Sequence, residues 1–260
     1  MTQFIFVIGA SGTGKSTVSA EMEAIIRQKG LTVATLNLDH YYLPASKVVH
    51  TPEKNFDVPE ALEQDLIKAH LNALEKGDTI SRPTYNMKIS DRVLGGEEEF
   101  PATDVVIVEG IFAGEYINTL DKNTATFKVY VQSMHVPDNY ARKEERDTVE
   151  REKSEVQMRI NKRNQLACLY KYVAPHMNDA NLVIENTWQP VVESASVDIK
   201  VPMVTNDKLT KLEQFLSVTP TSTEGVSAYT RAASFFATNY SVTFQSSKDT
   251  YDSGAKPSNF

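Results

Sequence analysis

Near its N-terminus the chain reads Gly9-Ala10-Ser11-Gly12-Thr13-Gly14-Lys15-Ser16-Thr17, directly after the apolar run Phe4–Ile8. The segment has the form G-x-x-x-x-G-K-[ST] and lies between a strand pattern and a helical pattern, which is the context that this phosphate-binding motif requires. Its glycines let backbone N–H groups turn toward an anion, and the following helix adds its positive N-terminal end. We therefore expect these nine residues to form a loop that binds the phosphates of a nucleotide.

Two side chains of this loop have specific chemistry. Lys15 can reach the outer phosphates of a nucleoside triphosphate, and the hydroxyl of Ser16 can join the ligands of a Mg²⁺ ion that bridges them. The motif therefore predicts ATP and Mg²⁺ as ligands. The alternative is a Gly-rich turn that binds nothing, and the flanking strand and helix patterns argue against it.

Composition limits the class of protein. The 260 residues suffice for one large α/β domain, and no apolar run approaches the length of a membrane span. Because 34 acidic residues outnumber 27 basic ones and the net charge is −7, binding to nucleic acid is not expected. We expect no signal peptide, a cytoplasmic location and small-molecule partners, and we leave open a homo-oligomer. The single cysteine, Cys168, has apolar neighbours and is expected in the core.

Strand and helix patterns alternate along the chain. The expected strands are Phe4–Ile8, Leu31–Leu38, Asp104–Val108, Phe127–Val131 and Asn181–Glu185. The expected helices are Lys15–Lys29 and Pro59–Lys76. This order predicts an α/β protein in which helices flank a mostly parallel sheet. With the phosphate-binding motif at its start, the expected fold is that of P-loop NTPases. Ligands of such sheets bind beyond the carboxyl ends of the strands.

Two acidic residues follow predicted strands, and their side chains should meet the phosphate loop. Asp39 lies where a carboxylate could accept a proton from a substrate hydroxyl. Glu109 ends the apolar strand that plays the Walker B role, so it is expected to hold Mg²⁺ together with Ser16. The alternatives are a capping or loop aspartate at 39 and a solvated acid at 109.

A basic segment between residues 142 and 163 is expected to form a helical lid. Arg146 and Arg151 have a spacing that suits cations closing over a transferring phosphoryl group. Acidic residues are interleaved with the basic ones, so the alternative is an ordinary solvated helix.

An ordered set of further motifs resembles the uridine kinase family of P-loop kinases over roughly residues 4 to 190. The set comprises Asp39-His40-Tyr41-Tyr42, Asn55-Phe56-Asp57-Val58-Pro59-Glu60-Ala61, Arg82-Pro83-Thr84-Tyr85 with Arg92, Val108-Glu109-Gly110-Ile111, Arg146-Asp147-Thr148-Val149-Glu150-Arg151, and Tyr172-Val173-Ala174-Pro175 followed by Ala180-Asn181-Leu182-Val183-Ile184. The resemblance implies a kinase domain at residues 1–200. A C-terminal extension without an assigned role follows at 201–245, with Val197–Val204 as a candidate edge strand. We expect a disordered tail at 246–260.

The resemblance also implies roles for individual residues. Asp39 would be the general base toward a ribose 5′-hydroxyl, and Asp57 would bind the 2′- and 3′-hydroxyls. Tyr42 and Tyr85 would line the nucleoside pocket, while Arg146 and Arg151 would belong to the lid. The substrate site would further include Ser90, Arg92 and Lys143. Asp57 could instead simply start the helix that follows it.

The sequence departs from the family pattern near the substrate. Ser90 stands where the pattern has a base-contacting histidine, and Lys143 stands where it has an arginine. Because serine is shorter than histidine and lysine lacks the planar fork of arginine, the base end of the pocket and the lid should differ from the pattern.

These observations predict an ATP- and Mg²⁺-dependent small-molecule kinase that phosphorylates a primary hydroxyl, with the 5′-hydroxyl of a ribonucleoside similar to uridine or cytidine as the leading acceptor. A P-loop kinase for another polyol, similar to phosphoribulokinase, is one alternative. A nucleotide-binding regulatory module without catalysis is the other.

Overall fold

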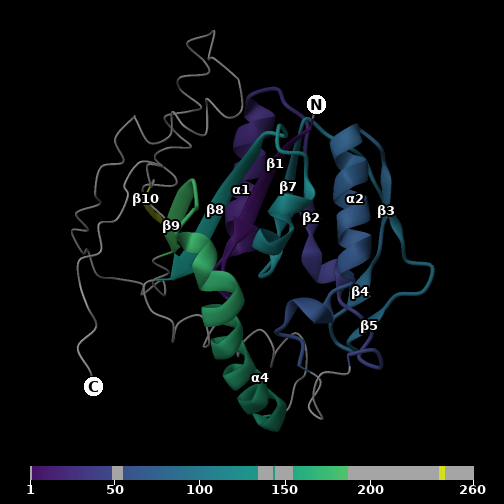
Figure 1. The fold of residues 1–260 in the computed structure, drawn as a ribbon, viewed down its shortest axis with the longest axis vertical. Helices are drawn as coiled ribbons and strands as arrows, with labels where there is room; N and C mark the ends of the chain where they lie inside the picture. Colours follow the sequence, from purple (N-terminus) through teal and green to yellow (C-terminus); the bar gives the residue numbers. More distant parts are fainter. Residues whose placement is uncertain (1, 49–54, 134–142, 144–154, 187–239, 244–260) are drawn as a thin grey trace, which may run out of the picture.

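The computed structural model describes residues 2–48, 55–133, 143, 155–186 and 240–243, with the backbone alone for 155–161 and 240–243. Its centre is a six-stranded sheet in the order β10-β9-β8-β1-β7-β2 (Figure 1). The strands are β1 (Gln3–Ile8), β2 (Val33–Asn37), β7 (Val105–Glu109), β8 (Thr126–Ser133), β9 (Leu182–Asn186) and β10 (Tyr240–Thr243). All neighbours pair in parallel except β10, which is antiparallel to β9. The predicted α/β fold with a mostly parallel sheet is confirmed.

Helices and two small antiparallel sheets surround this sheet. The longer helices are α1 (Lys15–Gln28), α2 (Gln64–Lys76) and α4 (Glu155–Cys168). Shorter helical turns are η1 (Leu38–Tyr41), η2 (Pro59–Ala61), η3 (Ala113–Thr119), η4 (Leu169–Val173) and η5 (Ala174–Met177). The small sheets pair β3 (Ile80–Arg82) with β6 (Glu98–Phe100) and β4 (Tyr85–Asn86) with β5 (Asp91–Arg92). These short strands were not predicted, because two or three residues are too few to show a period.

The central strand β1 is buried on both faces, as its unbroken apolar sequence predicts. Successive side chains of a strand point to opposite faces. Phe4, Phe6 and Ile8 therefore join the core that includes α2 and η3, while Ile5 and Val7 join the core beneath α1. Every one of these five side chains has no exposed surface. Burial of both faces fixes the position of the phosphate loop, which leaves the sheet at the carboxyl end of β1.

The helix predicted for Pro59–Lys76 is wrong at its start, because the structure divides it into η2 and α2. Between them Leu62 has an extended backbone and forms a β-bridge with Tyr42. The Leu43 N–H donates to the Ala61 carbonyl at 2.8 Å, and the Glu63 N–H donates to the Tyr41 carbonyl at 2.9 Å. Pairing with the segment after β2 thus replaces the helical hydrogen bonds at this point. Helical periodicity alone cannot reveal such a tertiary partner.

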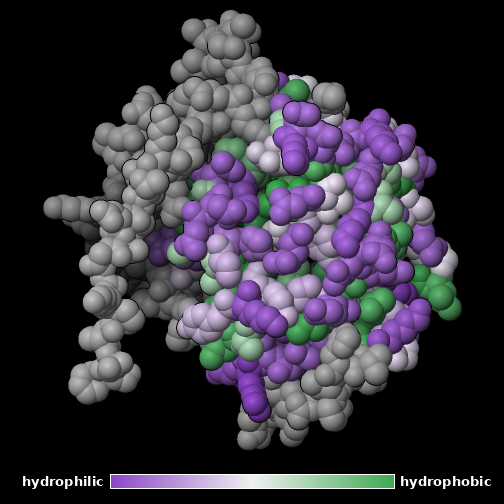
Figure 2. Space-filling view, in the orientation of Figure 1, coloured by the Kyte–Doolittle hydropathy of each residue, from purple (hydrophilic) through white to green (hydrophobic). Residues whose placement is uncertain are grey.

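The C-terminal extension contributes β10 to the sheet, which the sequence did not predict. The candidate edge strand at 197–204 and the tail at 246–260 lie outside the described residues. Cys168 is buried, as expected, and burial raises the pKa of its thiol to about 12. The face seen in Figure 2 is largely hydrophilic, with hydrophobic residues in separate small areas. Within the described ranges, no helix has the length and apolar content that a membrane crossing requires.

Candidate active site

The phosphate loop joins β1 to α1 and is held by its own hydrogen bonds. The Ala10 carbonyl accepts from the Thr13 N–H at 3.3 Å, from Thr13 Oγ1 at 2.9 Å and from Lys15 Nζ at 3.0 Å. Gly12 and Gly14 have φ angles of 82° and 91°, a region that side chains other than glycine's disfavour. Gly9 has a second requirement, since a Cβ there would lie 2.2 Å from the Val131 carbonyl oxygen. The glycines of the motif are thus explained by backbone geometry and by close packing.

Ser16 and Glu109 meet at the mouth of this loop. Ser16 Oγ donates to Glu109 Oε1 at 2.6 Å, although 93 positions separate them. Glu109 is the last residue of β7 and is only 5% exposed, so the solvated-acid alternative does not hold. Burial raises the pKa of Glu109, against the opposing effects of the Ser16 hydrogen bond and the charge of Lys15.

A hydroxyl beside a carboxylate fits the oxygen ligands that Mg²⁺ takes from a protein when phosphates supply the others. The described residues hold no group of three or more His, Cys, Asp and Glu side chains that could bind a metal alone. Ser16 and Glu109 could supply two of the oxygen ligands of a Mg²⁺ ion.

Asp39 follows β2 within the turn η1. Its N–H donates to Asn37 Oδ1 at 2.8 Å, so Asn37 is the residue whose side chain caps this turn. The capping alternative for Asp39 therefore does not apply. Asp39 lines the same cavity as Lys15, Ser16 and Glu109.

This cavity has a volume of about 320 Å³ and continues from the phosphate loop into a compartment with aromatic walls. The Tyr42 ring lies 5.9 Å from the Phe56 ring and 5.8 Å from the Tyr85 ring, measured between centroids. Met87 adds a further apolar side chain to the lining. Such a compartment suits a flat or apolar group.

An ion pair lies in the same compartment. Lys143 Nζ is 4.0 Å from Asp57 Oδ1, and the two side chains are 12% and 13% exposed. The turn η2 is capped by Val58 without a side-chain hydrogen bond, so Asp57 does not start that helix. Both residues line the cavity, as the resemblance implied.

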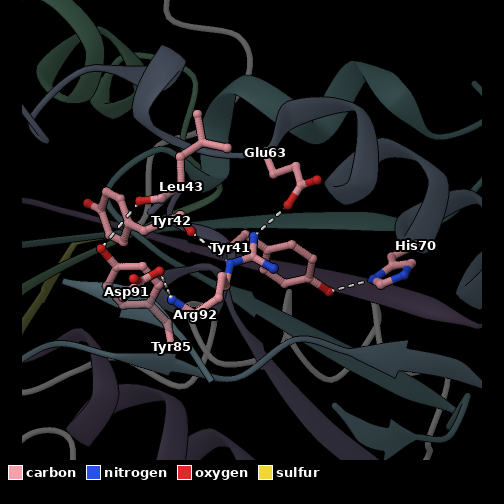
Figure 3. A network of polar contacts seen from close by, with 8 residues as sticks. All are labelled: Tyr41, Tyr42, Leu43, Glu63, His70, Tyr85, Asp91 and Arg92. Carbon is pink, nitrogen blue, oxygen red and sulfur yellow. Dashed lines mark hydrogen bonds and ion pairs between the residues drawn. The ribbon is translucent and has the colours of Figure 1, made fainter. Parts of the chain in front are cut away.

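Arg92, which was predicted in the substrate site, contacts the backbone of the wall residue Tyr42 and the side chain of Glu63 (Figure 3). Its Nε donates to the Tyr42 carbonyl at 2.8 Å, and its Nη2 pairs with Glu63 Oε2 at 2.7 Å. Within the described part of the chain it is absent from the residues that line the cavity. The guanidinium group of Arg92 therefore fixes the backbone of Tyr42. In the same region, Tyr41 Oη and His70 Nδ1 are 2.8 Å apart.

Ser90 also lines the cavity and has a φ of 53°, the one positive value at a non-glycine residue in the described ranges. The Ala45 N–H donates to its carbonyl at 2.9 Å. Burial raises the pKa of Tyr85 to about 12, while a hydrogen bond with Ser90 acts in the opposite direction. Ser90 is thus tied to the tyrosine that shares this wall.

The cavity brings together most of the predicted site residues. Those that line it are Ser11, Gly12, Gly14, Lys15, Ser16, Thr17, Asp39, Tyr42, Asp57, Tyr85, Ser90, Glu109 and Lys143. Gly9, Ala10 and Thr13 belong to the loop but are absent from the described lining. Arg146 and Arg151, with most of the predicted lid, lie outside the described residues.

The sequence alone predicts no site role for Phe56, Met87, Gly110, Ile111 and Asn186. The first four line the cavity, and apolar side chains or a glycine carry no signal for ligand binding of their own, even where they lie inside a motif. Asn186 donates from Nδ2 to the Thr13 carbonyl at 2.9 Å. Its position at the end of a predicted parallel strand was the available signal.

Comparisons with known proteins agree with this architecture. The family described as phosphoribulokinase / uridine kinase matches residues 4–193. A uridine kinase of Staphylococcus aureus is 34% identical over 158 residues, which are 59% of this chain and 72% of that protein.

Solved structures share the fold at low identity. D-glycerate 3-kinase from Cryptococcus neoformans has a TM-score of 0.53 at 14% identity, with 75% of this chain and 90% of that chain covered. Phosphoribulokinase from Rhodobacter spheroides has a TM-score of 0.51 at 15% identity, with 76% and 75% covered. Since the family match spans most of the chain and the phosphate loop, strand-end acids and parallel sheet accompany it, the protein belongs to the phosphoribulokinase / uridine kinase family and is a small-molecule kinase.

Proposed function

We propose that the protein transfers the γ-phosphoryl group of ATP to a primary hydroxyl, and that its acceptor is the 5′-hydroxyl of a ribonucleoside similar to uridine or cytidine. One observation carries the proposal. Asp39 lines a single cavity together with residues of the phosphate loop, with Tyr42 and Tyr85, and with Asp57. A carboxylate in the cavity that holds both donor and acceptor is what a general base for phosphoryl transfer requires.

The donor half would bind the triphosphate through backbone N–H groups of the loop and through Lys15. Ser16 and Glu109 would hold Mg²⁺, which supplies positive charge to the phosphate oxygens when bound. Support for this assignment is the 2.6 Å contact between the two side chains and the burial of Glu109.

Asp39 would accept the proton of the acceptor hydroxyl as that oxygen attacks the phosphorus atom. The bond to the γ-phosphorus forms from this oxygen, and ADP leaves with the bridging oxygen. Arg146 and Arg151 would complete the charge over the phosphates, and they stay predictions, as does the cytoplasmic location.

The acceptor half supports a ribonucleoside. Asp57 can accept hydrogen bonds from two vicinal hydroxyls, and the rings of Tyr42, Phe56 and Tyr85 offer faces to a flat base. Ser90, which lines the same cavity, cannot reach as far as the histidine of the family pattern. We therefore expect weaker discrimination among bases than a histidine would provide.

A polyol that already carries a phosphate is the second candidate, and Lys143 is the observation that favours it. This ammonium group lines the acceptor half and could bind an anionic substituent. The ion pair between Lys143 and Asp57 favours the ribonucleoside, because the carboxylate of Asp57 already offsets part of the positive charge of Lys143.

The test is a panel of acceptors incubated with ATP and Mg²⁺, with ADP release measured. The panel contains ribonucleosides, their 2′- and 5′-deoxy analogues, D-glycerate and phosphorylated polyols. Lys15→Ala serves as the inactive control, since loss of this cation should lower turnover about a thousandfold. We expect ADP release with ribonucleosides and none with 5′-deoxy analogues. Release with phosphorylated polyols alone would reject the ribonucleoside assignment.

A further inference from the structure

Asn186 is the last residue of β9 and contacts the phosphate loop from behind. Its Nδ2 donates to the Thr13 carbonyl at 2.9 Å, and a Cβ on Gly14 would lie 2.4 Å from the same nitrogen. Among the described residues that line the cavity, Asn186 is absent. We propose that Asn186 is a positioning residue that turns the Gly14 N–H toward the phosphates of the nucleotide.

One peptide unit links the Asn186 contact to the phosphate site. The Thr13 carbonyl and the Gly14 N–H belong to the same planar peptide group, and the described chain contains no cis peptide bond. In a trans peptide these two groups point in opposite directions. When Asn186 holds the carbonyl against β9, the N–H must face away from β9, and Gly14 lines the cavity.

This peptide needs an anchor because glycine does not fix it. Gly14 has a φ of 91°, and a glycine can also adopt other conformations that would rotate the neighbouring peptide plane. The Ala10 carbonyl receives its donors from Thr13 and Lys15, within the loop itself. The Thr13 carbonyl receives a donor from a different strand, which fixes the loop relative to the sheet.

The sheet holds Asn186 from both sides. It pairs in register with Ser133 on β8 and with Tyr240 on β10. Figure 1 shows β9 between these two strands. The preceding part of β8 also contacts the loop, where the Val131 carbonyl packs against Gly9. The ends of β8 and β9 thus hold the two halves of the phosphate loop, and β10 from the C-terminal extension pairs with the strand that carries Asn186.

The test compares Asn186→Leu with Asn181→Leu in the full-length protein. Leucine keeps a similar volume and removes the donor. Asn181 directly precedes the same strand at its other end, where its Oδ1 accepts from the Lys128 N–H at 2.7 Å. Loss of a hydrogen bond that orients an anion-binding N–H should weaken binding of Mg²⁺-ATP about tenfold in Asn186→Leu. The KM for the acceptor and the melting temperature should match those of Asn181→Leu.

The inference rests on the proposed nucleotide binding, and titration of the wild type with Mg²⁺-ATP separates the two. A wild type that binds no ATP would overturn both. A wild type that binds ATP, together with equal ATP affinity in the two leucine variants, would overturn the role of Asn186 alone. The role of Asn186 would also be overturned if the KM for ATP and the KM for the acceptor changed equally in Asn186→Leu and its melting temperature fell. Should Asn186→Leu not fold, Asn186→Ala removes the donor without adding charge and must show the same selective loss.

Discussion

At the scale of single residues, Asp57 decides the class of acceptor. If its carboxylate binds vicinal ribose hydroxyls, a 2′-deoxynucleoside donates one hydrogen bond fewer to this largely buried group. We expect kcat/KM for 2′-deoxyuridine to be about tenfold to a hundredfold below that for uridine. Asp57→Ala should raise the KM for uridine and remove this difference. Asp65→Ala, on the solvent-exposed side of α2, is the control. Indifference of the wild type to the 2′-hydroxyl would reject the ribonucleoside assignment.

Glu109 should make stability depend on pH, because burial raises its pKa in the folded state. A carboxyl with a raised folded pKa stabilises the fold while protonated, and this stabilisation is lost as the pH rises through the folded pKa. Glutamine stays neutral throughout. The melting temperature of Glu109→Gln, measured without Mg²⁺ and nucleotide, should therefore rise relative to that of the wild type between about pH 4 and pH 8.

Glu97→Gln alters an exposed carboxyl and serves as the control in that titration. Addition of Mg²⁺-ATP should then stabilise the wild type more than Glu109→Gln, because the carboxylate is a proposed metal ligand. A melting temperature of Glu109→Gln that falls relative to the wild type as the pH rises would contradict the effect of burial on this pKa.

At the scale of elements, two glycines with the same φ angle allow the cost of backbone strain to be measured separately from the loss of ATP binding. Gly14 starts α1 and Gly77 ends α2, both with a φ of 91°. A Cβ on Gly77 would meet nothing within 4 Å, whereas one on Gly14 would lie 2.4 Å from Asn186 Nδ2. We expect Gly77→Ala to lower the free energy of unfolding by about 1 kcal/mol and to leave ATP binding intact.

Gly14→Ala should show a comparable backbone cost and in addition lose most of its ATP binding, measured by titration calorimetry. Equal ATP affinity in the two alanine variants would contradict the account of the phosphate loop.

Elements could be predicted from sequence where a local signal existed. The apolar run before Gly9 and the motif itself predicted β1, the loop and α1, because their pattern is local. The break at Leu62 could not be predicted, since it depends on pairing with Tyr42. The same holds for β10, which is a short edge strand far along the chain from its partner.

The same difference between local signals and tertiary contacts applies to the site residues. Asp39 and Glu109 were predictable because parallel strands end at one edge of the sheet. The role of Arg92 behind the wall was not predictable, since a sequence pattern cannot distinguish a residue that touches substrate from one that holds the Tyr42 carbonyl.

At the scale of the whole molecule, the central sheet places Asp39 and Glu109 beside the phosphate loop. The phosphate loop follows β1, Asp39 follows β2 and Glu109 ends β7, and β7 pairs with both β1 and β2. The aromatic compartment is built from segments outside the central sheet, one of which is the short strand β4 with Tyr85. In the proposed mechanism Asp39 acts as a general base in the cavity that both halves share, so ATP binding and turnover should be separable in a variant of this residue.

The most direct measurement is single-turnover phosphoryl transfer by Asp39→Asn, together with its Kd for Mg²⁺-ATP and its KM for the acceptor. The amide keeps the shape of the carboxylate but cannot accept the proton. We expect the rate of transfer to fall about a hundredfold or more while the Kd and the KM stay within about a factor of three. A parallel loss of ATP affinity and rate would contradict the claim and assign Asp39 to metal binding or structure instead.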